Sequence, residues 1–179
     1  MKKKNEIATL AGGCFWCLET IFNRLKGVEK VYSGYAGGTK ETANYKAVCS
    51  GTTQHAEAVQ IYFDPDVITF EELLEVFWTM HDPTTLNKQG NDIGTQYRSA
   101  VFYHDDEQKK RTEKSIQEVA QSIWDAPIVT EIVPYTTFFQ AEDYHQDYYN
   151  RTGDQNPYCS LVISPKVQKF RKKYATKLK

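Results

Sequence analysis

Apolar residues recur at two spacings along this 179-residue chain, and each spacing predicts one type of secondary structure. Short apolar or alternating runs predict strands, since alternate side chains of a strand share one face. Between Val59 and Phe63, for example, apolar positions alternate with Gln60 and Tyr62. By this criterion five strands are predicted, at residues 6–10, 28–35, 59–63, 99–103 and 127–133.

Apolar residues at helical spacing predict helices between these strands. The best supported covers residues 69–80, where Thr69 and Glu72 have the spacing of a capping box and an apolar stripe follows. A second helix, capped by Asp105, would run to about Ser122 and bury Ile116, Val119 and Ile123. The remaining helical segments would begin at Cys14 and end at Gly27, follow Ser164-Pro165 with Val167 and Phe170 inward, and occupy part of 136–150.

The order of these elements predicts the fold class. Over the first hundred residues it is β-α-β-β-α-β, the split-βαβ arrangement. The sequence contains no internal repeat, linker or low-complexity segment. We therefore expect an α+β protein: a single two-layer domain over residues 1–179, with a ferredoxin-like βαββαβ core and an irregular C-terminal extension. The loop at 81–98 is too long for a plain connection, and loops of that length are often functional.

Composition and charge narrow the function classes. Hydrophobic residues make up 40% and charged residues 25%, with 22 basic against 23 acidic side chains and a net charge of -1. This balance gives no reason to expect nucleic acid or a membrane as partner. The lysines cluster near both ends, at 2–4 and 166–179, and are expected to be solvated. Only residues 7–11 are apolar near the start, too few for a secretory signal, so we expect a cytoplasmic protein without structural disulfides.

Gly13-Cys14-Phe15-Trp16-Cys17 is the segment richest in candidate chemistry. Cys14 follows a predicted strand and two glycines and stands at the start of a predicted helix, whose amides and dipole would favour the nucleophilic thiolate. Phe15 and Trp16 would place apolar surface beside the sulfur. The alternative is that Cys14 is a small buried residue and that both aromatics belong to the core.

The Cys14-x-x-Cys17 spacing has two further interpretations. It could be a thioredoxin-like redox pair, although two bulky aromatics between the cysteines are unusual there. It could also be half of a zinc site, but Cys49 and Cys159 are far apart in sequence and form no second pair. We therefore expect no metal.

Five ordered segments of the chain form a pattern together. They are Gly13 to Glu19; Gly34-Tyr35-Ala36-Gly37-Gly38 with Tyr45 downstream; Cys49 to Glu57; His81-Asp82-Pro83-Thr84 with Gln89 to Ser99; and Ala141 to Gln146. Together these segments resemble the peptide methionine sulfoxide reductase A family. One departure is Gln54, where the family usually has glycine.

The resemblance implies a role for each matching residue. Cys14 would attack the sulfoxide sulfur, Phe15 and Trp16 would hold the S-methyl group, and Glu57, Tyr45, Tyr97 and Asp92 would form the polar network around the sulfoxide oxygen. These residue types suit the chemistry, because the oxide leaving group must be protonated and a desolvated carboxyl can keep its proton near neutral pH. Each could instead be ordinary: Glu57 a surface carboxylate, the tyrosines partly buried, Asp92 a turn residue. His55, His81 and His145 are assigned structural hydrogen bonds.

Turnover would need a second thiol, because oxygen transfer leaves Cys14 as a sulfenic acid that condenses with a thiol. The candidates are Cys17, Cys49 and Cys159. Relatives with a Pro-Tyr-Cys segment use that position, which favours Cys159; Cys17 would require local unwinding of the helix, and Cys49 would pack as a small residue. The resemblance further implies no bound cofactor, thioredoxin as reductant (dithiothreitol in vitro), oxidised proteins or peptides as substrates, and a monomer.

Three functions can therefore be compared. The first, favoured by the resemblance, is reduction of methionine-S-sulfoxide in proteins, and of the free amino acid, as repair after oxidative damage. The second is a general disulfide oxidoreductase that uses Cys14 and Cys17. The third is a binding module without catalysis, whose aromatic loops hold oxidised peptides.

Overall fold

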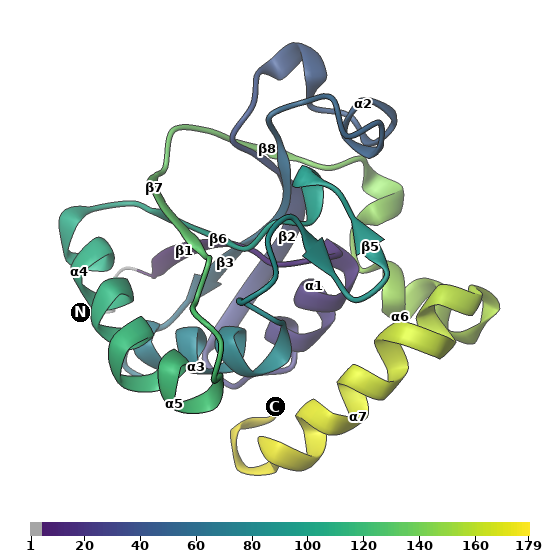
Figure 1. The fold of residues 1–179 in the computed structure, drawn as a ribbon. Coiled ribbons are helices and arrows are strands. Elements are labelled where there is room, and N and C mark those ends of the chain that lie inside the picture. Colours follow the sequence, from purple (N-terminus) through teal and green to yellow (C-terminus); the bar gives the residue numbers. More distant parts are fainter. Residues whose placement is uncertain (1–4) are drawn as a thin grey trace.

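A single six-stranded sheet forms the centre of the protein in the computed structural model, which describes residues 5–179 (Figure 1). The lysines at 2–4 lie outside the described residues. The strand order is β7-β6-β1-β3-β2-β8, and every neighbouring pair is antiparallel except β6 and β7. The strands are β1 (Glu6–Ala11), β2 (Val28–Ala36), β3 (Ala56–Phe63), β6 (Ala100–Tyr103), β7 (Glu131–Pro134) and β8 (Phe138–Gln140), with a separate hairpin of β4 (Lys88–Gln89) and β5 (Asp92–Ile93).

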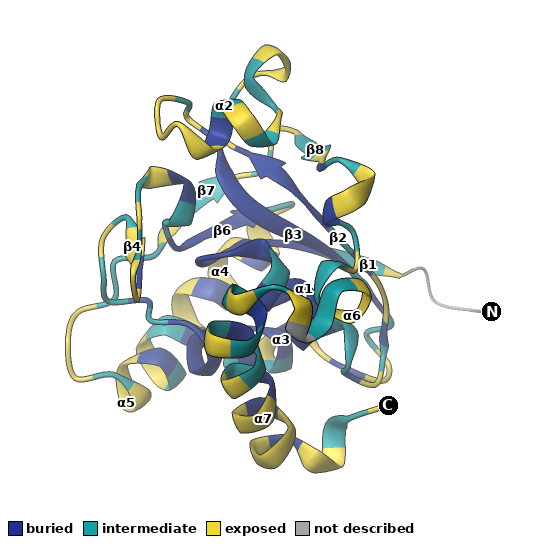
Figure 2. Ribbon diagram, turned by 90° about the vertical axis from the view of Figure 1, so that its right-hand side faces the viewer, coloured by how far each residue is buried: buried dark blue, intermediate teal, exposed yellow. Residues whose placement is uncertain are grey.

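The principal helices α1, α3 and α7 lie on one side of this sheet (Figures 1 and 2). Among residues 5–179, no helix is both long and apolar enough to cross a membrane. The helices are α1 (Phe15–Asn23), α2 (Tyr45–Cys49), α3 (Phe70–Met80), α4 (Asp106–Ser115), α5 (Gln121–Ile123), α6 (Tyr148–Thr152) and α7 (Ser164–Lys173), with π-helical turns at Ile116–Ala120 and Cys159–Ile163.

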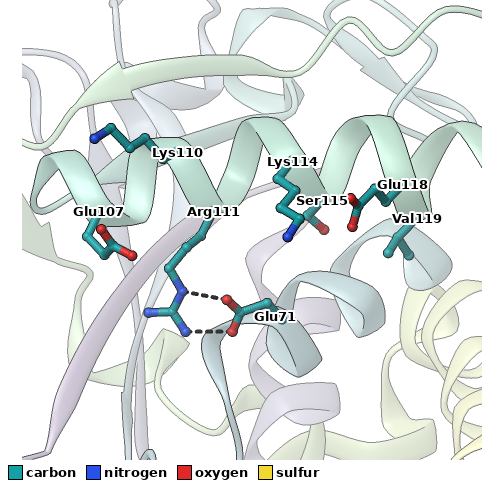
Figure 3. Close-up of a pocket in the computed structure, with 8 residues that line it drawn as sticks. All are labelled: Glu71, Glu107, Lys110, Arg111, Lys114, Ser115, Glu118 and Val119. Atoms are coloured by element: carbon teal, nitrogen blue, oxygen red, sulfur yellow. Dashed lines mark hydrogen bonds and ion pairs between the residues drawn. The ribbon is translucent and has the colours of Figure 1, made fainter.

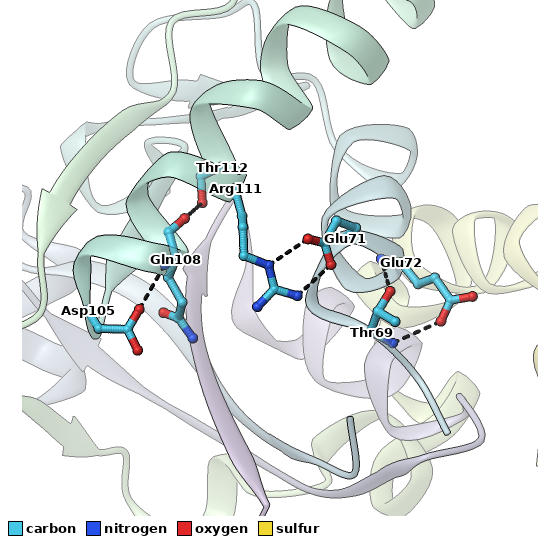
Figure 4. A network of polar contacts seen from close by, with 7 residues as sticks. All are labelled: Thr69, Glu71, Glu72, Asp105, Gln108, Arg111 and Thr112. Carbon is cyan, nitrogen blue, oxygen red and sulfur yellow. Dashed lines mark hydrogen bonds and ion pairs between the residues drawn. The ribbon is translucent and has the colours of Figure 1, made fainter. Parts of the chain in front are cut away.

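The predicted starts of α3 and α4 are confirmed, because both depend on local capping (Figure 4). The Thr69 hydroxyl accepts a hydrogen bond from the Glu72 amide at 3.1 Å, and the Glu72 carboxylate accepts one from the Thr69 amide at 2.9 Å. Asp105 caps α4 by accepting from the Gln108 amide at 2.8 Å. Side chains that satisfy the first amides of a helix therefore mark both boundaries.

The two faces of the sheet bury side chains of different size. Toward the helices, the strands present large residues such as Leu10, Val59 and Ile61, which belong to the main core with α1 and α3. The opposite face carries a second, smaller core, where the chain passes close to the sheet: a Cβ on Gly34 would lie 2.3 Å from the Phe138 ring. The fully buried alanines of this second core are Ala11, Ala36, Ala56, Ala58 and Ala100.

The small residues allow the sheet to roll. In a flat sheet, the edge strands β7 and β8 would be about 24 Å apart, at about 4.8 Å per strand spacing. Only residues 135–137 join β7 to β8, and four extended residue steps reach about 14 Å. The sheet must therefore curl so that its edges approach each other, with the alanine face on the inside.

Some sequence expectations differ from the structure. The first helix ends at Asn23 rather than at Gly27, and Ile123, expected in the core, is 40% exposed. The stretch expected to be partly helical, 136–150, does contain helical turns; it also contains β8, which the sequence did not predict because β8 is specified by its pairing with β2 rather than by a local pattern. The lysine-rich end of α7 and its inward Val167 and Phe170 are confirmed.

Candidate active site

The turn between β1 and α1 brings the chain against two buried side chains and leaves room only for glycine. A Cβ on Gly12 would lie 2.7 Å from the His81 ring, and Gly13 has φ +82° and faces Gln89. Cys14 follows in an extended conformation as the N-terminal cap residue of α1. The turn thus places the thiol at the N-terminal cap of the helix, close to the helix start that the sequence predicts.

A cavity of about 200 Å³ opens beside Cys14. The sequence predicts every residue of its wall except Tyr158. The 81–98 loop supplies two of them, which supports its expected functional role. The wall consists of Cys14, Phe15, Trp16, Tyr45, Glu57, Asp92, Tyr97 and Tyr158.

Glu57 is a buried acid in this cavity. It is the second residue of β3, not a residue before the strand, and only 2% of it is exposed. Burial raises the pKa of Glu57 to about 8; a hydrogen bond from the Phe15 amide, at 3.2 Å, opposes that rise, while Asp92 and Cys17 add to it. Glu57 is therefore mainly protonated at pH 7, which confirms the rise in pKa expected from desolvation.

The resting state of Cys14 differs from the expectation. The Trp16 amide does favour a thiolate, as expected for a helix start, but burial, a hydrogen bond with Cys17 and the charge of Glu57 outweigh it and raise the pKa of Cys14 well above its ordinary value. The helix start therefore favours the thiolate as predicted, but it does not set the pKa of Cys14, because the thiol is 8% exposed and beside an acid. Cys14 rests as a thiol.

Three tyrosines complete the polar wall, and burial raises the pKa of each hydroxyl. Tyr45 and Tyr97 therefore remain proton-bearing donors at neutral pH. Tyr158 donates to the Asp92 carboxylate at 2.5 Å. No local pattern marks Tyr158; its position immediately before Cys159 is the one signal by which the sequence could have identified it.

An aromatic cluster forms the apolar side of the cavity. The Trp16 indole stacks on Tyr148, with ring centroids 3.9 Å apart at 11°, and its N–H donates to His145 Nδ1 at 3.1 Å. An indole only donates, so the His145 proton is on Nε2, which is buried without a hydrogen-bond partner among the described residues. Burial lowers the pKa of His145 and keeps the ring neutral.

His55 and His81 have the structural roles assigned from the sequence. His55 accepts from the Gly38 amide at 3.1 Å and bonds the Thr39 carbonyl at 2.8 Å. His81 bonds the Phe77 carbonyl and, at 2.7 Å, the Ser99 hydroxyl; burial lowers its pKa to about 4. Both imidazoles therefore hold backbone beside the site.

Comparison with known proteins agrees with this geometry. The family model described as peptide methionine sulfoxide reductase matches residues 6–178. The chain belongs to this family. It is 53% identical over 174 residues to peptide methionine sulfoxide reductase MsrA of Saccharolobus solfataricus (97% of each chain), and 54% identical over 167 residues to MsrA of Leptospira borgpetersenii (93% of this chain, 94% of the relative).

Solved structures of methionine sulfoxide reductases share its mixed helix and strand fold. Reduced Mxr1 of Saccharomyces cerevisiae superposes with a TM-score of 0.78 at 40% identity, covering 86% of this chain and 88% of Mxr1. The same yeast protein in complex with Trx2 matches with a TM-score of 0.56 at 31% identity, over 81% and 85% of the two chains. As a member of this family, the chain is an oxidoreductase that reduces methionine sulfoxide, and its recognition as the A type is confirmed.

None of the four cysteines forms a disulfide, and they lie at different distances from this chemistry. The Cys17 thiol is hydrogen-bonded to Cys14. Cys159 is fully buried in the π-helical turn directly after Tyr158. The expectation that Cys49 packs as a small residue is wrong: it is exposed at the end of α2, where its thiol contacts the Tyr45 hydroxyl. Among the side chains that the structure describes, no cluster of His, Cys, Asp and Glu could hold a metal ion.

Proposed function

We propose that this enzyme reduces the S epimer of methionine sulfoxide, both as a residue of oxidised proteins and as the free amino acid. Cys14 would be the nucleophile and Glu57 the proton donor. The observation that supports this most is the pairing of a buried thiol with a buried, protonated carboxyl in one aromatic cavity. An S-methyl group fits apolar Phe15 and Trp16. The sulfoxide oxygen would face Glu57, Tyr45 and Tyr97, with Asp92 held in the same network by Tyr158.

The resting protonation states suit the first step. Glu57 donates its proton to the sulfoxide oxygen, and the Cys14 sulfur attacks the sulfur atom while its own proton replaces the one that Glu57 gave. The new bond between the two sulfur atoms and the substrate's sulfur–oxygen bond then both break as the oxygen passes to Cys14, which releases methionine. Methionine sulfur is reduced by two electrons and Cys14 is oxidised by two, to a sulfenic acid.

We further propose that Cys159 resolves this sulfenic acid. Its thiol would displace water and form a disulfide with Cys14, which a thioredoxin-type dithiol would then reduce. The neighbouring Tyr158 already lines the cavity, and a rearrangement of the π-helical turn that contains Cys159 would bring its sulfur to Cys14. The yeast relative's structure with Trx2 supports thioredoxin as the reductant.

Cys17 is the principal alternative, because it already contacts Cys14. Mass spectrometry after one equivalent of sulfoxide distinguishes them. A Cys14–Cys159 linkage in the wild type, with sulfenic acid accumulating in Cys159→Ser but not in Cys17→Ser, is expected. A Cys14–Cys17 linkage would rule the proposal out.

The overall function is tested by supplying purified protein with dithiothreitol and each epimer of N-acetylmethionine sulfoxide. Turnover of the S epimer alone, abolished in Cys14→Ser, is expected. Insulin-disulfide reduction that requires Cys17, without sulfoxide turnover, would instead favour a general disulfide oxidoreductase, and binding without turnover would favour a binding module.

We also propose a ferredoxin-like core, a monomeric state, a cytoplasmic location and a reaction without a bound cofactor. The order β6-β1-β3-β2 with α1 and α3 on one side supports a ferredoxin-like core. The near-neutral charge and the catalytic thiols suit a monomer in a reducing cytoplasm. No bound cofactor is required, because the thiols supply both electrons.

A further inference from the structure

Glu19 is buried on α1, only 3% exposed, although the chemistry above does not use it. It lies one helical turn after Phe15 and Trp16, and residues three or four apart share a helix face. A carboxylate in such a place must have hydrogen-bond partners, because burying it without them is costly.

Its partners belong to two separate parts of the chain. One carboxylate oxygen accepts from the Asp147 amide at 2.5 Å, and the Tyr148 amide also bonds the group. The other oxygen accepts from the Ser33 hydroxyl of β2 at 3.1 Å. Asp147 has φ +56° and makes no cap with its own side chain, so Glu19 supplies the acceptor that the start of α6 lacks.

Those contacts bear directly on the wall of the cavity. The residue whose amide Glu19 holds, Tyr148, is the one that stacks on Trp16, and His145, two residues before Asp147, accepts from the Trp16 indole. Gln146 attaches the same segment to β2 by accepting from the Ser33 amide at 3.0 Å and donating to its carbonyl at 2.9 Å. Trp16 and Glu19 thus hold one segment from the same face of α1.

We propose that Glu19 is a positioning residue of the active site: its carboxylate fixes residues 145–148 against Trp16 and so sets the shape of the apolar wall that receives the substrate methyl group. The inference rests on the proposed function of Trp16. It involves no contact between Glu19 and the substrate, so its signature is in substrate binding rather than in the chemical step.

The electrostatics of the pocket give this role a pH dependence. Burial raises the pKa of Glu19 to about 7; the Ser33 hydroxyl and the Asp147 and Tyr148 amides oppose the rise, and the Asp147 carboxylate, the charged group facing it from the neighbouring segment, adds to it. Only the ionised form accepts from all of these donors, so the segment is held most firmly above about pH 7.

The test compares four variants with the wild type in reduction of N-acetylmethionine sulfoxide from pH 6 to 8. Glu19→Gln should raise KM about tenfold at pH 8 with kcat within about twofold, and its KM should no longer fall as pH rises. Ser33→Ala should have a smaller effect, because the amide contacts remain. Asp147→Asn, which tolerates positive φ, should move the KM transition to lower pH. Exposed Glu113→Gln should match the wild type.

A direct structural measurement accompanies the kinetics. The Trp16 indole N–H resonance, assigned with Trp16→Phe, should move in Glu19→Gln and stay in place in Glu113→Gln, because it reports the bond to His145. A Glu19→Gln enzyme with wild-type KM, pH profile and indole resonance overturns the inference. If Glu19→Gln does not fold, an unshifted profile in Asp147→Asn overturns it.

Failure of the proposed function gives a different result. Wild-type protein without sulfoxide turnover would reject the function, while the indole resonance would still decide whether Glu19 holds the segment.

Discussion

Two hollows in the surface of this molecule contain glutamates whose pKa values are shifted in opposite directions. The larger, about 510 Å³, lies between α3 and α4, and there Glu71 forms two hydrogen bonds with Arg111 (Figure 3). That pairing lowers the pKa of Glu71. In the smaller hollow, of about 200 Å³, Glu57 has no cation beside it and burial raises its pKa. Size therefore does not identify the reactive site; desolvation without a compensating cation does.

Replacement of the nucleophile, Cys14, should cause the largest loss of turnover. Cys14→Ser should lower turnover at least about 10³-fold, because a hydroxyl neither attacks sulfur nor forms the sulfenic acid. The measurement is dithiothreitol-supported reduction of the S epimer, with Glu71→Gln as the control from the other hollow. Appreciable turnover by Cys14→Ser would show that the reaction does not take place in the smaller hollow.

The second test exchanges the two glutamates for glutamine. Glu57→Gln should lower kcat about 10²-fold or more, because the amide cannot protonate the oxide, whereas Glu71→Gln should leave kcat unchanged. Wild-type kcat should fall as pH rises through about 8, where Glu57 loses its proton, and the residual Glu57→Gln activity should lack that decline. Equal pH profiles in Glu57→Gln and the wild type would show that another group is the acid.

The burial of Glu57 should also make the free energy of unfolding depend on pH. An acid with a raised folded pKa binds its proton more tightly in the fold than in the unfolded chain, so the wild type loses stability as pH rises from about 4.5 to about 8. Glu57→Gln should be less sensitive over that range, and at pH 8.5 it should gain stability relative to the wild type. Urea unfolding at pH 6 and 8.5 measures this; parallel losses in both proteins would contradict a buried, neutral Glu57.

The smallest effect is expected in the larger hollow. Arg111→Ala should reduce the free energy of unfolding by less than about 1 kcal/mol, since half of the Glu71 side chain is exposed and water screens the pair. Because the pKa of Glu71 is lowered in the folded protein, the ion pair contributes its full stability at pH values above the pKa of Glu71 in the unfolded chain. That contribution is lost as the pH falls through the pKa of Glu71 in the folded protein. If Arg111→Ala lowered the free energy of unfolding by several kcal/mol at pH 7, the ion pair would not be screened by water as we infer. If it lowered turnover, the larger hollow would also take part in the reaction.

Local chemistry explains what the sequence predicts well. Capping by Thr69 and Asp105 and the glycine turn before Cys14 depend on neighbouring residues, so each could be located without the fold. Apart from Tyr158, the residues of the cavity wall were also predictable, but from the family motifs rather than from spacing, because the wall comes from five separate segments.

The features that the sequence did not predict depend on contacts between residues distant in sequence. The raised pKa of Cys14 follows from Glu57 and Cys17 acting together under burial, which a helix-start argument omits. Tyr158 reaches the cavity only because the chain after α6 returns to α1, and β8 exists only because Gly34 offers it a partner. Burial and long-range pairing are not encoded in any short window of sequence.

The rolled sheet has a consequence for biosynthesis. Gln140 pairs with Gly34, so the ribosome must synthesise more than a hundred residues before this edge of the sheet can close. Until then the segment bearing His145 and Tyr148 cannot dock, and Cys14 emerges early without its aromatic wall. Contacts this distant slow folding. The nascent enzyme therefore carries Cys14 without its aromatic wall until the residues around His145 and Tyr148 have been synthesised.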